Sequence, residues 1–251
     1  MIKHYLITGD THGQCVRFGA IDRAQYPPEE TAIIVLGDGG NNYYLDDRDV
    51  RLKRTLLRLG YTFYFVRGNH EARPEDISTM ELVFDDAVNG LIYYEPDYPN
   101  IHYFFDGGEY KINGRTILVI GGAYSVDKQY RLARGWQWFY NEQLNDEERT
   151  FISNKVKGNH YDIVLTHTSP YSWEPREMFL PYIDQSSVDD STERWLEEIK
   201  DSITFDFWLF GHFHGDKIVS NNSAMLYEQV INFDMINPID EYTEIPEGFR
   251  I

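Results

Sequence analysis

Short apolar runs recur along the chain, and several stop abruptly at a glycine followed by polar residues. The clearest run is 61–66, after which Gly68, Asn69, His70 and Glu71 come almost at once. Short apolar runs with this kind of boundary are typical of strands buried on both faces of a sheet. Because open α/β sheets carry their sites at the carboxyl ends of the strands, we predict a functional loop after this run.

The same patterning predicts most of the secondary structure. Apolar runs predict strands at 5–7, 31–36, 61–66, 91–94, 101–105, 162–165 and 205–210, antiparallel strands within 110–120, and a hairpin over 216–233. Helical spacing predicts helices at 16–24, 48–59, 145–156 and 187–200 and one within 74–89. Gly60, Asn113-Gly114 and Asn145 are expected to be, respectively, a helix C-cap, a tight turn and a helix N-cap. The alternation of strand and helix over 5–66 indicates βαβ units, whose parallel strands share one carboxyl edge.

Polar side chains follow five of these predicted strands. They are Asp10 and His12, Asp38, Asn69 and His70, His167, and His212 and His214. Taken singly, each could be ordinary turn or capping chemistry. Burying two carboxylates together with several imidazoles would be costly without a cation, so the set as a whole predicts a metal site.

The other three histidines lie at strand starts and provide a comparison. Gly158-Asn159-His160 repeats the tripeptide found at 68–70, but it precedes a strand. We expect His160 at the opposite edge of the sheet, and surface or capping roles for His4, His102 and His160.

Composition narrows the range of partners and compartments. A net charge of −18 argues against stable binding to nucleic acid and against an anionic membrane surface. The lone Cys15 leaves no internal disulfide, and no apolar run approaches 18 residues, so we expect a soluble cytoplasmic protein. Without a linker or repeat, residues 1–236 are predicted to form a single domain and 237–251 an acidic, loosely packed tail.

The type and number of donors indicate which metals would bind. Carboxylates, imidazoles and one carboxamide without thiolates suit Mn, Fe or Zn and disfavour a structural zinc site. There are too many donors for one ion that must keep an open position. Two ions about 3.5–4 Å apart that share a carboxylate would use all of them.

The ordered set of motifs resembles the calcineurin-like metallophosphoesterase superfamily. The matching pieces are Asp10-x-His12, Gly37-Asp38, Gly68-Asn69-His70-Glu71, His167 and Gly211-His212-x-His214. The resemblance implies an α/β fold, a four-layer αββα sandwich in which two mixed sheets pack between helices, with a dinuclear metal site at the strand ends. It also implies two ligand sets that share Asp38 as a bridge, one of Asp10, His12, Asp38 and His214 and the other of Asp38, Asn69, His167 and His212.

The resemblance further implies hydrolysis of a phosphate ester by a metal-bridging hydroxide, with His70 as the general acid. The chain departs from the protein phosphatases of the family, which carry Gly-Asp-x-x-Asp followed by an arginine. Here residues 37–42 read Gly-Asp-Gly-Gly-Asn-Asn. We expect Asn41 to accept a hydrogen bond from His70 without adding charge, and the missing arginine removes a phosphate clamp.

The substrate is predicted less directly. The stretch 121–138 carries Lys128, Arg131 and Arg134 and is the expected wall of the site, with Arg131 or Arg73 as a phosphate contact. The aromatic residues near Tyr171 are expected to pack in the core. The weaker alternative is that they form a shelf for a base or an aryl group. The leading hypothesis is a phosphatase or phosphodiesterase acting on a small molecule or nucleotide. A Ser/Thr-type protein phosphatase, a nuclease and a non-catalytic metal-binding scaffold are the alternatives.

Overall fold

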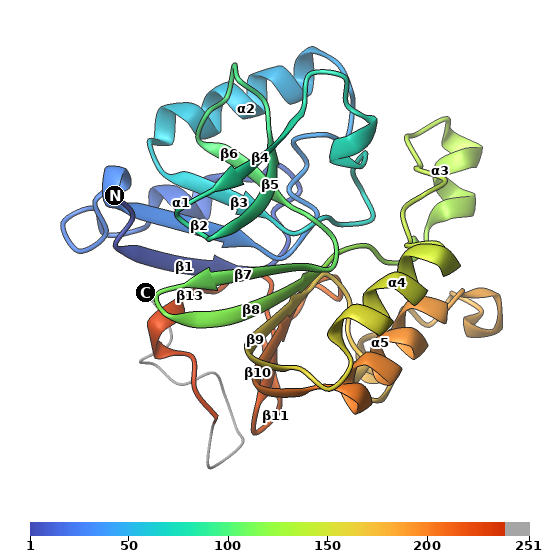
Figure 1. The fold of residues 1–251 in the computed structure, drawn as a ribbon. Coiled ribbons are helices and arrows are strands. Elements are labelled where there is room, and N and C mark those ends of the chain that lie inside the picture. The colour runs from blue at the N-terminus through green and yellow to red at the C-terminus, as the bar shows by residue number, and fades with distance from the viewer. Residues whose placement is uncertain (239–251) are drawn as a thin grey trace.

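Two β-sheets packed face to face, with helices on both outer sides, make up the computed structural model, which describes residues 1–238 (Figure 1). The first sheet has the strand order β13-β1-β2-β3-β6-β5-β4 and the second β11-β12-β10-β9-β8-β7. In the first, β1, β2, β3 and β6 are parallel, while β13, β5 and β4 are antiparallel to their neighbours. In the second, β12, β10, β9 and β8 are parallel, with β11 and β7 antiparallel at the edges.

The strands have the following bounds. They are β1 (His4–Thr8), β2 (Thr31–Val35), β3 (Thr62–Phe65), β4 (Glu81–Asp85), β5 (Gly90–Tyr94), β6 (Ile101–Phe104), β7 (Gly108–Ile112), β8 (Arg115–Ile120), β9 (His160–Thr166), β10 (Thr204–Phe210), β11 (Lys217–Ser220), β12 (Ser223–Met225) and β13 (Val230–Asn232). The helices are α1 (Val16–Gly19), α2 (Asp47–Leu59), α3 (Lys128–Arg134), α4 (Asp146–Val156) and α5 (Ser191–Ser202). Single 3₁₀ turns lie at Pro28–Glu30, Pro74–Asp76, Tyr171–Trp173, Arg176–Met178, Gln185–Ser187 and Phe233–Met235.

Three hydrophobic clusters define four layers. The central cluster joins the inner faces of the two sheets, for example Ile34 of β2 and Leu165 of β9. A second cluster packs α1 and α2 on the first sheet, through Phe18 and Leu56. A third packs α4 and α5 on the second sheet. Strands covered on both faces must be apolar throughout, which is why β2 is buried at every position. The predicted αββα sandwich is confirmed.

The predicted caps and turns hold in detail. Gly60 ends α2 with a φ of 84°, a left-handed conformation that glycine adopts without steric cost. Asn145 caps α4 and forms a capping box with Glu148. Asn113-Gly114 turns β7 into β8. Of the hairpin predicted at 216–233, only β11 and β12 form one, because β13 pairs with β1 in the first sheet.

Several predicted elements need correction. The helix predicted within 74–89 is wrong, because this stretch forms one 3₁₀ turn and β4, which pairs antiparallel with β5. Val83 and Phe84 are residue types that favour strands, and the hydrogen-bond partner of this strand, β5, comes from a later segment of the chain. The strand at 101–105 is β6, which runs parallel to β3 and antiparallel to β5. The helix predicted at 16–24 is a single turn, α1, and that predicted from residue 187 begins at Ser191.

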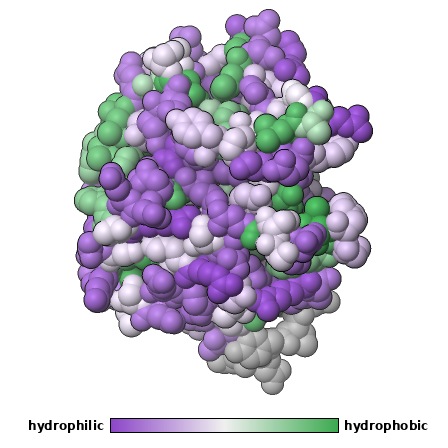
Figure 2. All heavy atoms as spheres, turned by 90° about the vertical axis from the view of Figure 1, so that its right-hand side faces the viewer, coloured by the Kyte–Doolittle hydropathy of each residue, from purple (hydrophilic) through white to green (hydrophobic). Residues whose placement is uncertain are grey.

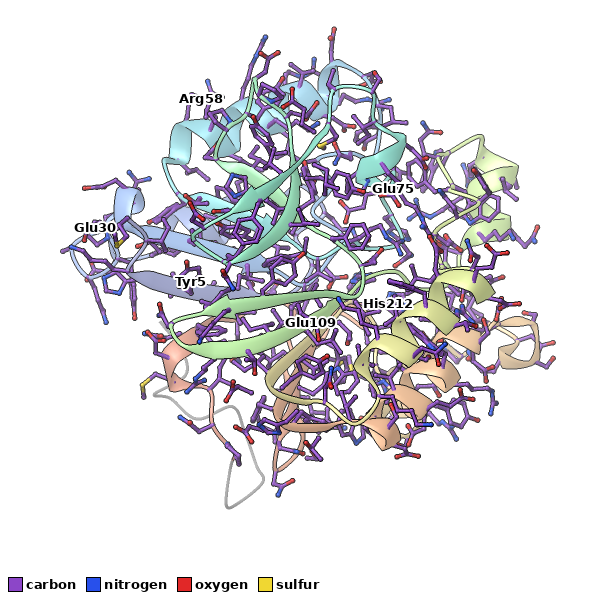
Figure 3. All side chains as sticks on the ribbon, viewed as in Figure 1. Tyr5, Glu30, Arg58, Glu75, Glu109 and His212 are labelled. Carbon is purple, nitrogen blue, oxygen red and sulfur yellow. The ribbon has the colours of Figure 1, made fainter. Side chains whose placement is uncertain are left out.

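The parallel strands of both sheets point their carboxyl ends toward one side of the molecule. His212, which follows β10, lies at that side, whereas Glu30, which precedes β2, lies at the opposite end (Figure 3). The predicted tail at 237–251 falls almost entirely outside the described residues, and both domain boundaries remain predictions. Among residues 1–238, every helix is too short or too polar to cross a bilayer.

Candidate metal centre

A first group of side chains gathers where β1, β2 and β10 end. The Nε2 atoms of His12 and His214 lie 2.8 Å apart. Asp10 Oδ2 is 3.5 Å from Nε2 of His214 and 3.9 Å from Nε2 of His12. Asp38 Oδ2 is also 3.9 Å from Nε2 of His12. Two imidazoles and two carboxylates, drawn from three distant segments, therefore point their donor atoms at one small volume.

A second group continues the first on the far side of Asp38. His167 Nε2 lies 3.7 Å from Asp38 Oδ1 and 2.8 Å from the side-chain oxygen of Asn69. The ring of His212 packs against that of His167 at a centroid distance of 5.0 Å. The structure thus brings together all seven residues predicted as metal ligands.

Neighbouring groups fix the orientation of two of these side chains. The other ring nitrogen of His167, Nδ1, bonds the carbonyl of Leu36 at 2.7 Å, which leaves Nε2 to face the site. The amide nitrogen of Asn69 donates to Ser125 Oγ at 2.8 Å, and that hydroxyl donates to the buried carboxylate of Glu142 at 2.6 Å. These contacts turn the amide oxygen of Asn69 toward His167.

The backbone of the site is strained where the ligand candidates sit. His12, Asp38, His212 and His214 have φ values of 45°, 48°, 69° and 54°. Residues other than glycine adopt this left-handed conformation infrequently, and such residues cluster at functional sites. Four of the seven predicted ligands carry this conformational cost, which the surrounding sheet ends must offset.

Two glycines make room for the carboxylates. A Cβ atom at Gly68 would lie 2.0 Å from Asp38 Oδ1, and one at Gly211 would lie 2.3 Å from Asp10 Oδ1. Both glycines belong to the sequence motifs, and close approach explains why a side chain does not fit at either position.

The electrostatics of the two carboxylates fit a cation. Asp10 and Asp38 are buried, and Asp10 Oδ2 has no hydrogen-bond partner among the described residues. Burial alone would raise the pKa of Asp38, but His70 and His167 outweigh it and hold the pKa of that carboxyl well below its usual range. Burial lowers the pKa of His212 to about 3, so that its imidazole is neutral and has a lone pair to offer. Neutral imidazoles and ionised carboxylates are the forms that bind metal, and the donor set fits a metal ion.

His70 lies beside this set but both of its ring nitrogens already face charged side chains. Its Nδ1 atom is 3.0 Å from Arg131 Nη2 and 3.3 Å from Asp38 Oδ2. Its Nε2 atom is 3.6 Å from Asp127 Oδ1, an ion-pair separation. Although burial opposes it, Asp38 and Asp127 together raise the pKa of His70.

The two arginines predicted as phosphate contacts differ in what they have left to offer. All five N–H groups of Arg73 have partners, one on Nε, two on Nη1 and two on Nη2. The partners are the carboxylates of Glu75 and Glu148 and the carbonyls of Asn141 and Gln143. This places Arg73 in a structural ion pair at the start of α4, away from a phosphate role.

Arg131 keeps one donor in reserve. It uses one contact from Nε to Asp127, two from Nη1 to Tyr43 and Gln137, and one from Nη2 to His70, which are four of its five N–H groups. The remaining N–H of Nη2 has no partner among the described residues. Arg131 is thus the one of the two that reaches the candidate centre.

The prediction that Asn41 accepts a hydrogen bond from His70 is wrong. Its side chain is fully buried, but neither its oxygen nor its nitrogen forms a hydrogen bond in the described structure. The ring of His70 is contacted by Asp127 and Arg131 instead of by Asn41. Asp127 was not among the predicted site residues, although its spacing of four residues from Arg131 is a known signal for an ion pair on a helix.

The comparison histidines lie away from the site. His160, at the start of β9, has a side chain 53% exposed and faces Asp206 at 3.7 Å. His4 packs on the ring of Tyr26, and His102 bonds the carbonyl of Pro99. His102 is half-buried in β6, so it lies in the sheet instead of on the surface.

Comparison with known proteins identifies the family. The sequence model of the calcineurin-like phosphoesterases matches residues 3–216. Among solved structures, TT1561 of Thermus thermophilus aligns with a TM-score of 0.42 and 13% identity, over 90% of this chain and 89% of that one. The calcineurin-like phosphoesterase YfkN from Bacillus subtilis aligns with a TM-score of 0.39 and 12% identity, over 97% and 86%. Another solved structure reaches 0.49 at 13% identity, over 98% and 100%.

No curated protein matches the sequence significantly. The structural alignments are too distant to add to the family match, which alone covers most of the chain. The chain belongs to the calcineurin-like phosphoesterase family, whose members are hydrolases acting on phosphoric ester bonds.

Proposed function

We propose that this protein hydrolyses a phosphate ester of a small molecule or nucleotide, with two metal ions held by the seven predicted ligands and His70 as the proton donor. The observation that carries the proposal is the position of Asp38 between the two groups. Its Oδ1 faces His167, while its Oδ2 faces His12 and His70. A carboxylate with a different imidazole set on each oxygen is suited to be shared by two cations.

Bound metal ions would supply an activated water and would neutralise charge on the phosphoryl oxygens. The residues of this chain supply the rest. Asp10, His12, Asp38 and His214 would hold one ion and Asp38, Asn69, His167 and His212 the other. Manganese, iron and zinc all suit this oxygen and nitrogen set.

His70 is proposed as the group that protonates the leaving oxygen. It lies next to Asp38, and its Nε2 atom is 3.6 Å from Oδ1 of Asp127, a side chain outside the predicted ligand set. The carboxylates that raise its pKa favour the protonated form that an acid catalyst needs. The remaining N–H of Arg131 is proposed to bind a phosphoryl oxygen beside it.

The charge of the protein supports a small substrate. With a net charge of −18, the chain would repel a long polyanion, so stable nucleic-acid binding and attachment to a membrane surface are not expected. Arg131 supplies an arginine beside the metal residues that could bind one phosphate group.

Turnover of three substrates by Mn²⁺-loaded protein tests the proposal. We expect hydrolysis of p-nitrophenyl phosphate or bis-p-nitrophenyl phosphate and none of single-stranded DNA. Activity on DNA alone would favour a nuclease. Metal bound at two equivalents without turnover of any of the three would favour a scaffold and overturn the proposed function.

A further inference from the structure

A cavity of about 440 Å³ lies next to the candidate centre and is lined by Tyr43, Tyr44, Arg48, Gly135, Trp136 and Gln137. None of these residues is a predicted metal ligand, and three of them, Gly135, Trp136 and Gln137, belong to the stretch predicted as the wall of the site. The cavity lies between the loop that follows the Asp38 motif and the segment that follows α3. Its volume is within the range of pockets that hold small organic ligands.

Three aromatic side chains line the cavity, and two of them are open to solvent. Trp136 is 52% exposed and Tyr44 is 39% exposed. The rings of Tyr43 and Tyr44 meet edge to face at 4.7 Å, which holds them as a rigid pair. The guanidinium of Arg48 lies over the ring of Tyr44, 3.6 Å from its centroid, and covers one face of that ring.

The cavity is connected to His70 through one side chain. The hydroxyl of Tyr43 accepts a hydrogen bond from Arg131 Nη1 at 2.8 Å, and Nη2 of the same guanidinium lies 3.0 Å from His70 Nδ1. On the other wall, the backbone N–H of Trp136 donates to the carbonyl of Arg131 at 2.9 Å. Arg131 therefore fixes both walls of the cavity relative to the candidate proton donor.

The surroundings favour a small ligand over a protein partner. The face of the molecule that carries α3 is largely hydrophilic, and its hydrophobic residues form separate groups instead of one continuous apolar surface (Figure 2). A docking face for a protein would need a larger contiguous area. Tyr43 on one wall of the cavity and Trp136 on the other suit a flat ring that packs between them.

We propose that this cavity, called here the Tyr43–Trp136 pocket, binds a planar aromatic ring in the leaving group of the substrate. The substrate would then be a phosphate ester whose alcohol carries an aryl group or a nucleobase. The inference rests on the proposed function, because it takes the phosphate to lie at the metal residues beside His70.

Binding of three phosphonates to Mn²⁺-loaded protein, measured by calorimetry, tests the pocket independently of turnover. Benzylphosphonate carries the ring, cyclohexylmethylphosphonate has a similar size without a flat π face, and ethylphosphonate has neither. We expect benzylphosphonate to bind about tenfold more tightly than the other two, as is usual for one stacked ring. Equal affinity of the benzyl and cyclohexylmethyl compounds, or no binding of benzylphosphonate, would overturn the proposal.

Substitution of the tryptophan identifies the place of binding. Trp136→Ala should reduce the affinity for benzylphosphonate to that for ethylphosphonate and leave ethylphosphonate itself unchanged. Tyr140→Ala is the matched control, since Tyr140 is 82% exposed and does not line the cavity. An unchanged preference for the ring in Trp136→Ala would place the ring elsewhere. Turnover of p-nitrophenyl phosphate with no ring preference would refute the pocket alone, whereas metal-bound protein without turnover would refute the proposed function.

Discussion

Nε2 of His70 lies 3.6 Å from Oδ1 of Asp127, although His70 follows β3 and Asp127 is the residue just before α3. Arg131 completes the arrangement by bonding Asp127 through Nε and His70 through Nη2. In the related protein phosphatases, a second aspartate of the Gly-Asp-x-x-Asp motif supports the corresponding histidine. The position of that aspartate is occupied here by Asn41, and the carboxylate that faces Nε2 of His70 comes from Asp127.

Replacing Asp127 by asparagine should weaken the proposed acid catalysis without loss of metal. The carboxylate raises the pKa of His70 and holds its ring, so Asp127→Asn should lower kcat about tenfold on alkyl phosphates, whose leaving groups need a proton. The effect on p-nitrophenyl phosphate should be small, because p-nitrophenolate leaves unprotonated. Steady-state kinetics on both substrates provide the check, with exposed Asp201→Asn as control. A uniform loss on both substrates would indicate a purely structural role.

Removing the imidazole of His70 should have a larger effect of the same kind. His70→Ala is expected to lower kcat on alkyl phosphates at least about 100-fold, the range that a general acid contributes. Metal content by elemental analysis should stay at the wild-type level, because His70 is not one of the seven proposed ligands and its Nε2 atom faces Asp127. Loss of a metal ion from this variant would mean that His70 is a ligand.

The strand-exit residues could be predicted from sequence because each is delivered by a short local motif. Asp10 and His12 share one loop after β1, and a parallel sheet brings such loops to a common edge. Asp127 could not be placed in this way, because the path from β8 to α3 depends on contacts between Arg131 and Tyr43. The strand β4 was missed for a similar reason. Its stability comes from pairing with β5, whereas the spacing of apolar residues in the segment favoured a helix.

The Asn69–Ser125–Glu142 chain of hydrogen bonds gives a prediction about metal affinity. Ser125→Ala removes the acceptor that holds the amide nitrogen of Asn69, so the amide oxygen is no longer fixed toward His167. Loss of such an outer contact typically weakens metal binding about 10- to 100-fold. Titration of apo-protein with Mn²⁺ measures this, and exposed Ser186→Ala should bind as the wild type does. Unchanged affinity in Ser125→Ala would show that Asn69 is not a ligand.

Gly68 gives a prediction that separates the site from the fold. The Cβ of Gly68→Ala would lie 2.0 Å from Asp38 Oδ1, so the carboxylate must move away from His167. We expect this variant to lose Mn²⁺ binding and turnover while circular dichroism still shows the folded α/β content. Gly19→Ala is the control, since a Cβ there meets no atom within 4 Å. Normal metal affinity in Gly68→Ala would contradict the proposed use of Asp38.

Glu193 of α5 predicts how stability depends on pH. Its buried carboxyl accepts a hydrogen bond from Thr168 Oγ1 at 2.7 Å, and burial raises its pKa from 4.5 to about 7. The folded protein therefore holds an extra proton between about pH 5 and pH 7, and the stability from this group is complete at low pH and falls as pH rises through that range. Glu193→Gln stays neutral and can still accept the hydrogen bond. At about 1.4 kcal/mol per pKa unit, it should be more stable than wild type by up to about 3 kcal/mol at pH 8 and about equal to it at pH 4.5. Urea unfolding at the two pH values measures the difference in stability. The exposed Glu198→Gln variant is the control and should be as stable as the wild type at both. If Glu193→Gln is no more stable than the wild type at pH 8, the raised pKa of Glu193 is refuted.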